Sequence, residues 1–313
     1  MLALFTSTLS PMLMMFSCLV IGYLLSKFKI LPDNSATVLS RLSLYAFLPA
    51  LNISTLMKYG TVEILKEQGF YVLIGGILVV VAAAISYPLS KIFHKDGYQR
   101  NIYKYALTFA NFGFVGNAIV PIILGEEALF TFLLFTIPLS IACNSWGLSL
   151  MIPKDKLTGS PVKRLLTPPV IAMAVGFLLG ITNAQKVMPS FVTNTLNNLK
   201  GCLGPVSMVL TGCVVAKYDF RGLLKNPKVY LASAFRLLIL PALFVAVLLL
   251  LKMDTNIVLM TLFAFATPLG LNTVVFPSVY GEDPSTGASM AMISCTLCVV
   301  TIPLLYTIVS ILL

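Results

Sequence analysis

The sequence predicts an all-α integral membrane protein with ten transmembrane helices, arranged as two inverted repeats of five helices. Three observations support this prediction. Of the 313 residues, 58% are hydrophobic and only 10% are charged, whereas soluble domains carry about a quarter charged residues. Ten segments are apolar and close to the length that a membrane requires. The second half of the chain also repeats landmarks of the first half in the same order.

The ten apolar segments are separated by breaks that carry the Pro, Gly and charged residues typical of loops. A spanning helix needs about 20 mostly apolar residues. The sixth segment is short and the seventh contains Lys200, so these two fit the criterion least well. The segments cover residues 3–26, 36–57, 69–91, 103–124, 128–151, 168–185, 190–216, 229–251, 256–280 and 286–313.

The distribution of basic residues predicts the orientation. Loops alternate between the two faces of a ten-span protein. Loops on one face hold fourteen of the 21 Lys and Arg residues, at 27–29, 91–104, 154–164 and 217–228. The other face holds only four, namely Lys58, Lys66, Lys186 and Lys252. Because cytoplasmic loops carry the excess of Lys and Arg, both termini are predicted to lie outside.

The two halves resemble each other at an offset near 157 residues. The clearest match is Pro121–Glu127 with Pro277–Asp283, which end the fourth and ninth segments with the same P-x-x-x-G-E-acid pattern. We therefore expect a first repeat at 1–151, a short cytoplasmic linker at 152–167 and a second repeat at 168–313. Five spans per half would make the second repeat inverted. Many secondary transporters are built in this way and move their substrate by alternating access.

The fourth and ninth segments contain the candidate binding residues. Both carry glycine, proline and asparagine near their centres, which favours broken helices. We expect these two helices to break and cross each other. An intramembrane polar group at such a break is costly unless it is used. The predicted substrate-binding residues are Asn111, Gly113, Gly116, Asn117, Pro268, Gly270, Asn272 and Thr273.

Four prolines are predicted to kink or break helices in repeat-related segments: Pro49, Pro121, Pro205 and Pro277. Polar residues near Pro49 and Pro205, and in the fifth segment, would form further walls of the cavity. These residues are Asn52, Ser54, Thr55, Asn144, Ser145, Ser207 and Thr211.

Charge narrows the substrate class. All eleven acidic residues lie in loops or at segment ends, so no buried proton relay is evident. A neutral centre lined by amides and helix N-termini attracts anions, which favours a small organic anion. Arg236 lies inside the eighth segment, and it either snorkels to the interface, which we favour, or contacts the anion. In a sodium-coupled alternative, Glu126 or Glu282 would help to hold sodium.

Other protein classes fit less well. The basic residues are dispersed, which argues against a nucleic-acid partner. The six cysteines all lie in apolar segments, and Cys295 and Cys298 form a lone C-x-x-C pair, so no disulfide framework, metal or other cofactor is expected. No nucleotide-binding loop or catalytic cluster is present, so an enzyme is not predicted. A membrane receptor or sensor is the alternative from another class.

Several motifs resemble those of the auxin efflux carrier family. They are Asn111–Pro121 in the fourth segment, Leu44–Leu51 in the second, and Tyr280–Asp283 with the tail to Pro303. The resemblance implies a fold similar to bile acid:sodium symporters, with a scaffold and a crossover bundle. It also implies transport of carboxylates such as malonate, malate or, in plants, auxin. The short linker is similar to that of bacterial members, which implies the inner membrane. The sequence does not specify the substrate or the direction of transport. The coupling ion would be a proton or sodium, and the oligomeric state could be a homodimer.

Overall fold

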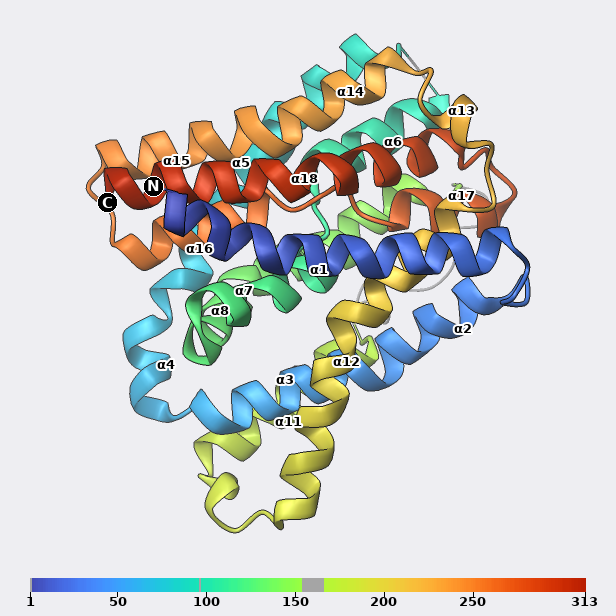
Figure 1. The fold of residues 1–313 in the computed structure, drawn as a ribbon. Coiled ribbons are helices and arrows are strands. Elements are labelled where there is room, and N and C mark those ends of the chain that lie inside the picture. Colours follow the sequence, from blue (N-terminus) through green and yellow to red (C-terminus); the bar gives the residue numbers. More distant parts are fainter. Residues whose placement is uncertain (1, 96, 154–165) are drawn as a thin grey trace.

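The computed structural model describes residues 2–95, 97–153 and 166–313, and these residues form helices joined by short connections (Figure 1). The first half contains α1 (Leu2–Lys27), α2 (Ser35–Leu42), α3 (Leu48–Tyr59), α4 (Val62–Gln68), α5 (Phe70–Phe93), α6 (Gly97–Thr108), α7 (Asn117–Leu124), α8 (Glu126–Ala142) and α9 (Leu148–Met151). The second half contains α11 (Pro168–Ile181), α12 (Ser190–Val215), α13 (Phe220–Leu223), α14 (Pro227–Ala234), α15 (Leu240–Leu250), α16 (Thr255–Phe265), α17 (Asn272–Tyr280) and α18 (Ser285–Leu312).

Within residues 2–95, 97–153 and 166–313, seven helical stretches are long and apolar enough to cross a membrane, judged by length and composition. They correspond to seven of the ten predicted spans. Three shorter apolar helices, Phe112–Leu124, Pro168–Ile181 and Thr255–Phe265, occupy the positions of the fourth, sixth and ninth spans. The chain is therefore a helical membrane protein, while the count of ten spans stays a prediction. Most of the predicted linker at 152–167 lies outside the described residues.

The described residues include four π-helical turns, within helices or, for η2, at a helix start: η1 (Ser43–Phe47), η2 (Phe112–Gly116), η3 (Cys143–Gly147) and η6 (Phe235–Ile239). Two of them lie just before a proline, Pro49 after η1 and Pro241 after η6. A proline has no N–H to donate, and its ring crowds the carbonyl one turn earlier, so a wider turn relieves the clash. The helix continues through Pro49, and Pro121, Pro205 and Pro277 also lie inside helices.

Close helix pairs hold the bundle together. The helix α1 packs along α12, α3 along α11, and α5 along α8. A Cβ atom added to Gly212 of α12 would lie 2.1 Å from the carbonyl oxygen of Leu19 in α1. One added to Gly176 of α11 would lie 2.9 Å from the carbonyl oxygen of Asn52 in α3. Small residues thus let backbones approach, which is the usual basis of helix association in membranes.

Two predicted helices are interrupted near their centres. In the first, α6 ends at Thr108 and helical structure resumes at Phe112. In the second, α16 ends at Phe265 and α17 begins at Asn272. We name residues 109–111 the first break and residues 266–271 the second break. Pro268 explains the second, because proline disfavours helix both at its own position and at the residue before it.

The two breaks meet. Ala110 and Leu269 form an isolated antiparallel bridge, and the backbone N–H of Asn111 donates to the carbonyl oxygen of Pro268 at 2.8 Å. The backbone N–H of Leu269 donates to the hydroxyl of Ser294 in α18 at 3.0 Å. Backbone groups released from a helix need such partners in a membrane. The pairing therefore explains how two non-helical segments are tolerated beside each other.

Candidate functional site

A cavity of about 300 Å³ lies beside the two breaks. The start of η2, the start of α17, α3, the turn η3 and α11 all contribute to its wall. Five asparagines line it: Asn52, Asn111, Asn117, Asn144 and Asn272. None of its described lining residues is charged. We call this space the amide cavity, and its volume is within the range of small-molecule sites.

Four of the five amides already have partners. The Nδ2 of Asn52 donates to the carbonyl oxygen of Pro169 at 2.9 Å, and that of Asn144 to the carbonyl oxygen of Ser140 at 2.8 Å. The Nδ2 of Asn117 donates to the carbonyl oxygen of Gly113 at 3.0 Å. These bonds hold the side chains in place. Each amide nitrogen still has a second hydrogen to donate.

Asn272 is held from across the cavity. Its Nδ2 donates to the hydroxyl of Tyr105 at 2.7 Å, and this hydroxyl also lies 3.0 Å from the Sγ of Cys143. Tyr105 is 1% exposed. The bond links the start of α17 to α6, so it positions the second break relative to the first.

Asn111 differs from the other amides. Only 5% of the residue is exposed, and its Nδ2 has no hydrogen-bond partner among the described residues. In the described part of the chain, the Oδ1 of Asn117 is also buried without a partner. An unpaired buried polar group is costly, so such groups usually mark a place where something binds. Two residues in the wall of the amide cavity therefore carry buried polar atoms without a partner in the described structure, a donor on Asn111 and an acceptor on Asn117.

Helix ends add to the electrostatics of the cavity. Helical structure starts at Phe112 and again at Asn272, and both starts line the amide cavity. The N-terminus of a helix carries partial positive charge from its free N–H groups. Two such ends beside one neutral cavity favour an anionic guest.

The structure brings together most of the predicted site residues. Asn111, Gly113, Asn117, Gly270 and Asn272 line the amide cavity. The other three predicted residues lie next to it with structural contacts, because Gly116 packs against the ring of Phe132, the carbonyl of Pro268 is bonded to Asn111, and the hydroxyl of Thr273 donates to the carbonyl oxygen of Gly270 at 2.8 Å.

The predicted further walls are only partly present. Asn52 and Asn144 line the amide cavity, whereas Ser54, Thr55, Ser145, Ser207 and Thr211 do not. Ser54 instead donates to the Oδ1 of Asn197 at 2.7 Å, and Thr211 to the backbone of its own helix. Sequence reasoning missed Tyr105. The available signal was a tyrosine, able to hydrogen-bond, six residues before Asn111 in an apolar segment.

Arg236 departs from our favoured interpretation. We expected its head group to snorkel to the interface, and this is wrong because the residue is 0% exposed. Its guanidinium lies over the ring of Phe265, 5.1 Å from the ring centroid. All three of its guanidinium nitrogens lack a hydrogen-bond partner among the described residues. Arg236 does not line the amide cavity, so its contact with an anion stays a prediction.

The candidate sodium ligands are engaged differently. The carboxylate of Glu126 forms an ion pair with Lys200 of α12. The backbone N–H of Glu282 donates to the carbonyl oxygen of Pro277 at 2.9 Å. Within the described part of the chain, no three His, Cys, Asp or Glu residues group in a way that could hold a metal ion.

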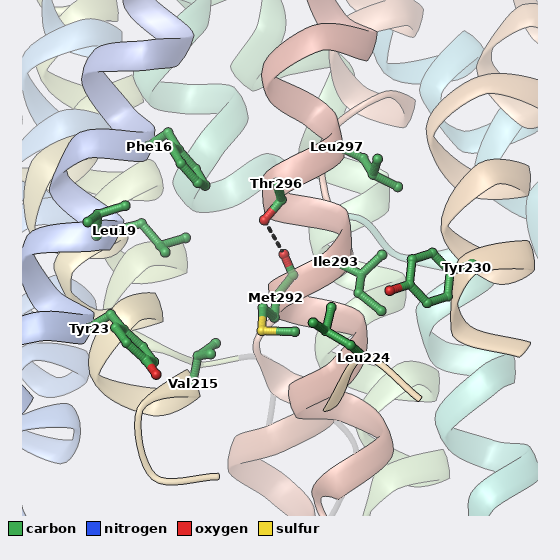
Figure 2. A pocket seen from close by; sticks show the side chains of 11 residues that line it. Phe16, Leu19, Tyr23, Val215, Leu224, Tyr230, Met292, Ile293, Thr296 and Leu297 are labelled. Carbon is green, nitrogen blue, oxygen red and sulfur yellow. Dashed lines mark hydrogen bonds between the residues drawn. The ribbon is translucent and has the colours of Figure 1, made fainter. Parts of the chain in front are cut away.

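A larger cavity of about 420 Å³ lies between α1 and α18, and Figure 2 shows its mostly apolar wall. Phe16, Leu19 and Ile293 are typical of its side chains. The hydroxyl of Thr296 is already bonded to the carbonyl oxygen of Met292 at 2.9 Å. Such a surface suits lipid or apolar groups better than an anion, so the amide cavity is the better candidate for the functional site.

Comparison with known protein families identifies the class of this chain. A family profile described as membrane transport protein matches the chain twice, over residues 7–158 and 155–306. A search of curated proteins gives no match. The two matches follow one another and together span nearly the whole chain. The chain therefore belongs to the auxin efflux carrier family of membrane transport proteins.

Proposed function

We propose that this membrane transport protein is a secondary transporter that moves a small organic anion, a mono- or dicarboxylate, through the amide cavity by alternating access. The observation that carries the proposal is the unpartnered Nδ2 of Asn111, which is buried at the wall of a neutral cavity beside two helix starts. A carboxylate would accept a hydrogen bond from this amide. A charged acceptor makes such a bond stronger than a neutral one does.

The proposed architecture is two inverted five-span repeats whose fourth and ninth helices break and cross. The landmarks that recur at an offset near 157 residues, such as Pro121–Glu127 and Pro277–Asp283, support an internal repeat. The bridge between Ala110 and Leu269 supports the crossing, because it joins the breaks of the two helices. We further propose outside termini and a bacterial inner membrane, on the basis of the basic loops and the short linker.

A sodium-coupled symporter of the bile-acid type is the alternative within transport. Oxygen ligands from backbone carbonyls at the breaks would suit sodium. The ion pair between Glu126 and Lys200 argues against a sodium ion at Glu126 in this conformation. Purified protein in proteoliposomes separates the alternatives. Uptake of labelled malonate and malate is measured with and without a sodium gradient and a pH gradient, and uptake of neither acid under any gradient would reject the proposed function.

The site itself is tested with Asn111→Ala. A hydrogen bond to a charged ligand is worth about 1.5–3 kcal/mol, so malonate affinity should fall by about tenfold to a hundredfold. Thermal stability in detergent should not fall, because the lost amide nitrogen has no partner among the residues that the structure describes. Asn197→Ala is the matched control, since Asn197 lies outside the amide cavity and accepts a bond from Ser54. It should lose about 0.6 kcal/mol of stability and keep its affinity.

A further inference from the structure

A third cavity, of about 230 Å³, shares Asn117 with the amide cavity. It lies between α1, α3, α7 and α12, and its polar lining residues are Asn117, Glu126 and Lys200. We call it the Lys200 cavity. The rest of its wall is apolar or is formed by glycine and proline. A Cβ atom added to Gly201 would meet nothing within 4 Å, so α12 leaves open space beside Lys200.

Lys200 is the informative residue in this wall. It lies in the middle of α12, a helix long and apolar enough to span a membrane, and only 13% of its side chain is exposed. An ionisable residue in such a position is expensive and is usually functional. Its ammonium group is neutralised by the carboxylate of Glu126. Binding a carboxylate is therefore what this group already does within the protein.

The charge of Glu126 depends less on the ion pair than the charge of Lys200 does. Its side chain is 51% exposed, and it lies in the first turn of α8, where the helix dipole stabilises a carboxylate. Solvent and the helix end could therefore keep Glu126 charged without Lys200. An ion pair with a half-exposed partner also adds little to stability. An incoming carboxylate could replace Glu126 at Lys200 at small cost to the fold.

Asn117 connects the two cavities, because it lines both. From Asn117, the Lys200 cavity extends along α7 towards Glu126. The amide cavity extends the opposite way, beside Asn111 and Gly113. Seven residues of α7 follow Asn117, and they rise about 10 Å. The two cavities thus lie one after the other along the fourth predicted span, in the direction that a substrate must cross.

We propose that the Lys200 cavity is a second binding site for the carboxylate substrate, placed between Asn117 and the face that contains Glu126. In this site a substrate carboxylate replaces Glu126 on the ammonium group of Lys200 and then passes to the amide of Asn117. The proposal rests on the proposed function, since it concerns a second position of the same substrate. No covalent step is involved.

Two charge-neutralising variants test the proposal in the full-length protein in proteoliposomes, with labelled malonate as the probe. Lys200→Gln removes the cation, and the apparent malonate affinity should fall by about tenfold or more. Glu126→Gln removes the internal competitor, and the affinity should rise several-fold. If the ion pair is purely structural, both variants should change stability alike and neither should change malonate affinity. Equal effects of the two variants, or no effect of either, would overturn the proposal.

Alkylation locates the ligand. Gly201→Cys in a Cys202→Ser background places a thiol in the Lys200 cavity, and the Cys202→Ser parent is the control for the other cysteines. Malonate should slow N-ethylmaleimide labelling at position 201 about tenfold, and adding Lys200→Gln should abolish this protection. If wild-type protein transports malonate but labelling at 201 is unchanged by malonate, the second site is rejected while the proposed function stands. If the wild type transports no dicarboxylate, both proposals fail.

Discussion

Both breaks border the amide cavity, but their other surroundings differ. The first break opens towards a cavity, because a Cβ atom added to Gly113 just after it would meet nothing within 4 Å. The second break is fastened to α18, where Leu269 is bonded to Ser294 and a Cβ atom added to Gly287 would lie 2.0 Å from the carbonyl oxygen of Thr273. Asn111, whose amide nitrogen is unpartnered among the described residues, belongs to the first break, whereas the amide of Asn272, just after the second break, is held by Tyr105. The first break is thus suited to binding and the second to positioning.

The largest effect is expected from Gly287→Ala. The new methyl group cannot fit against the backbone of Thr273, so α17 must move away from α18. Overpacking of this kind costs about 1–3 kcal/mol or more, and malonate affinity should fall with stability because the second break is displaced. Thermal unfolding in detergent and uptake in proteoliposomes measure the two effects.

Gly113→Ala is the matched control. It also adds one methyl group beside a break, but into open space, so its stability should equal or exceed that of the wild type. Equal destabilisation by the two alanines would show that the two breaks do not differ in the space beside them.

The next expected effect is a gain of stability, and it concerns Arg236, which lies beside the second break. Arg236 is a fully buried cation without a hydrogen-bond partner in the described structure, and it lies over Phe265, the last residue before the second break. Replacing buried charged groups by apolar ones of similar volume is often stabilising, by about 1–4 kcal/mol. Arg236→Met should therefore raise the melting temperature in detergent.

Arg236→Lys tests the cause of that stabilisation, because lysine keeps the charge. Its melting temperature should stay at or below the wild-type value. A melting temperature that falls in the methionine variant would show that Arg236 has a partner and contributes to the fold.

The sequence indicated where the chain would break but not what would face each break. Glycine, proline and asparagine in the fourth and ninth segments are local signals of a break. The ninth helix is interrupted at Pro268 and Gly270, whereas the fourth is interrupted at residues 109–111, just before its glycines, which lie in helical turns. The bond from Asn272 to Tyr105 and the pair of Lys200 with Glu126 join residues 167 and 74 positions apart. No local pattern encodes such contacts. Arg236 was misread for the same reason, since its depth depends on how α14, α15 and α18 pack around it.

The smallest effect is expected from the bond that joins the two breaks. Tyr105→Phe removes only the hydroxyl that accepts from Asn272. If that bond only positions the second break, malonate affinity should change by a few-fold, well below the loss in Asn111→Ala. Asn272→Ala removes the same bond from the other side. The double variant should then be no worse than the poorer single variant, because two changes that remove one interaction are not additive. Affinities measured for the four proteins of this cycle give the coupling directly. Additive losses would mean that Asn272 contacts the substrate independently of Tyr105, and the second break would then bind as well as position.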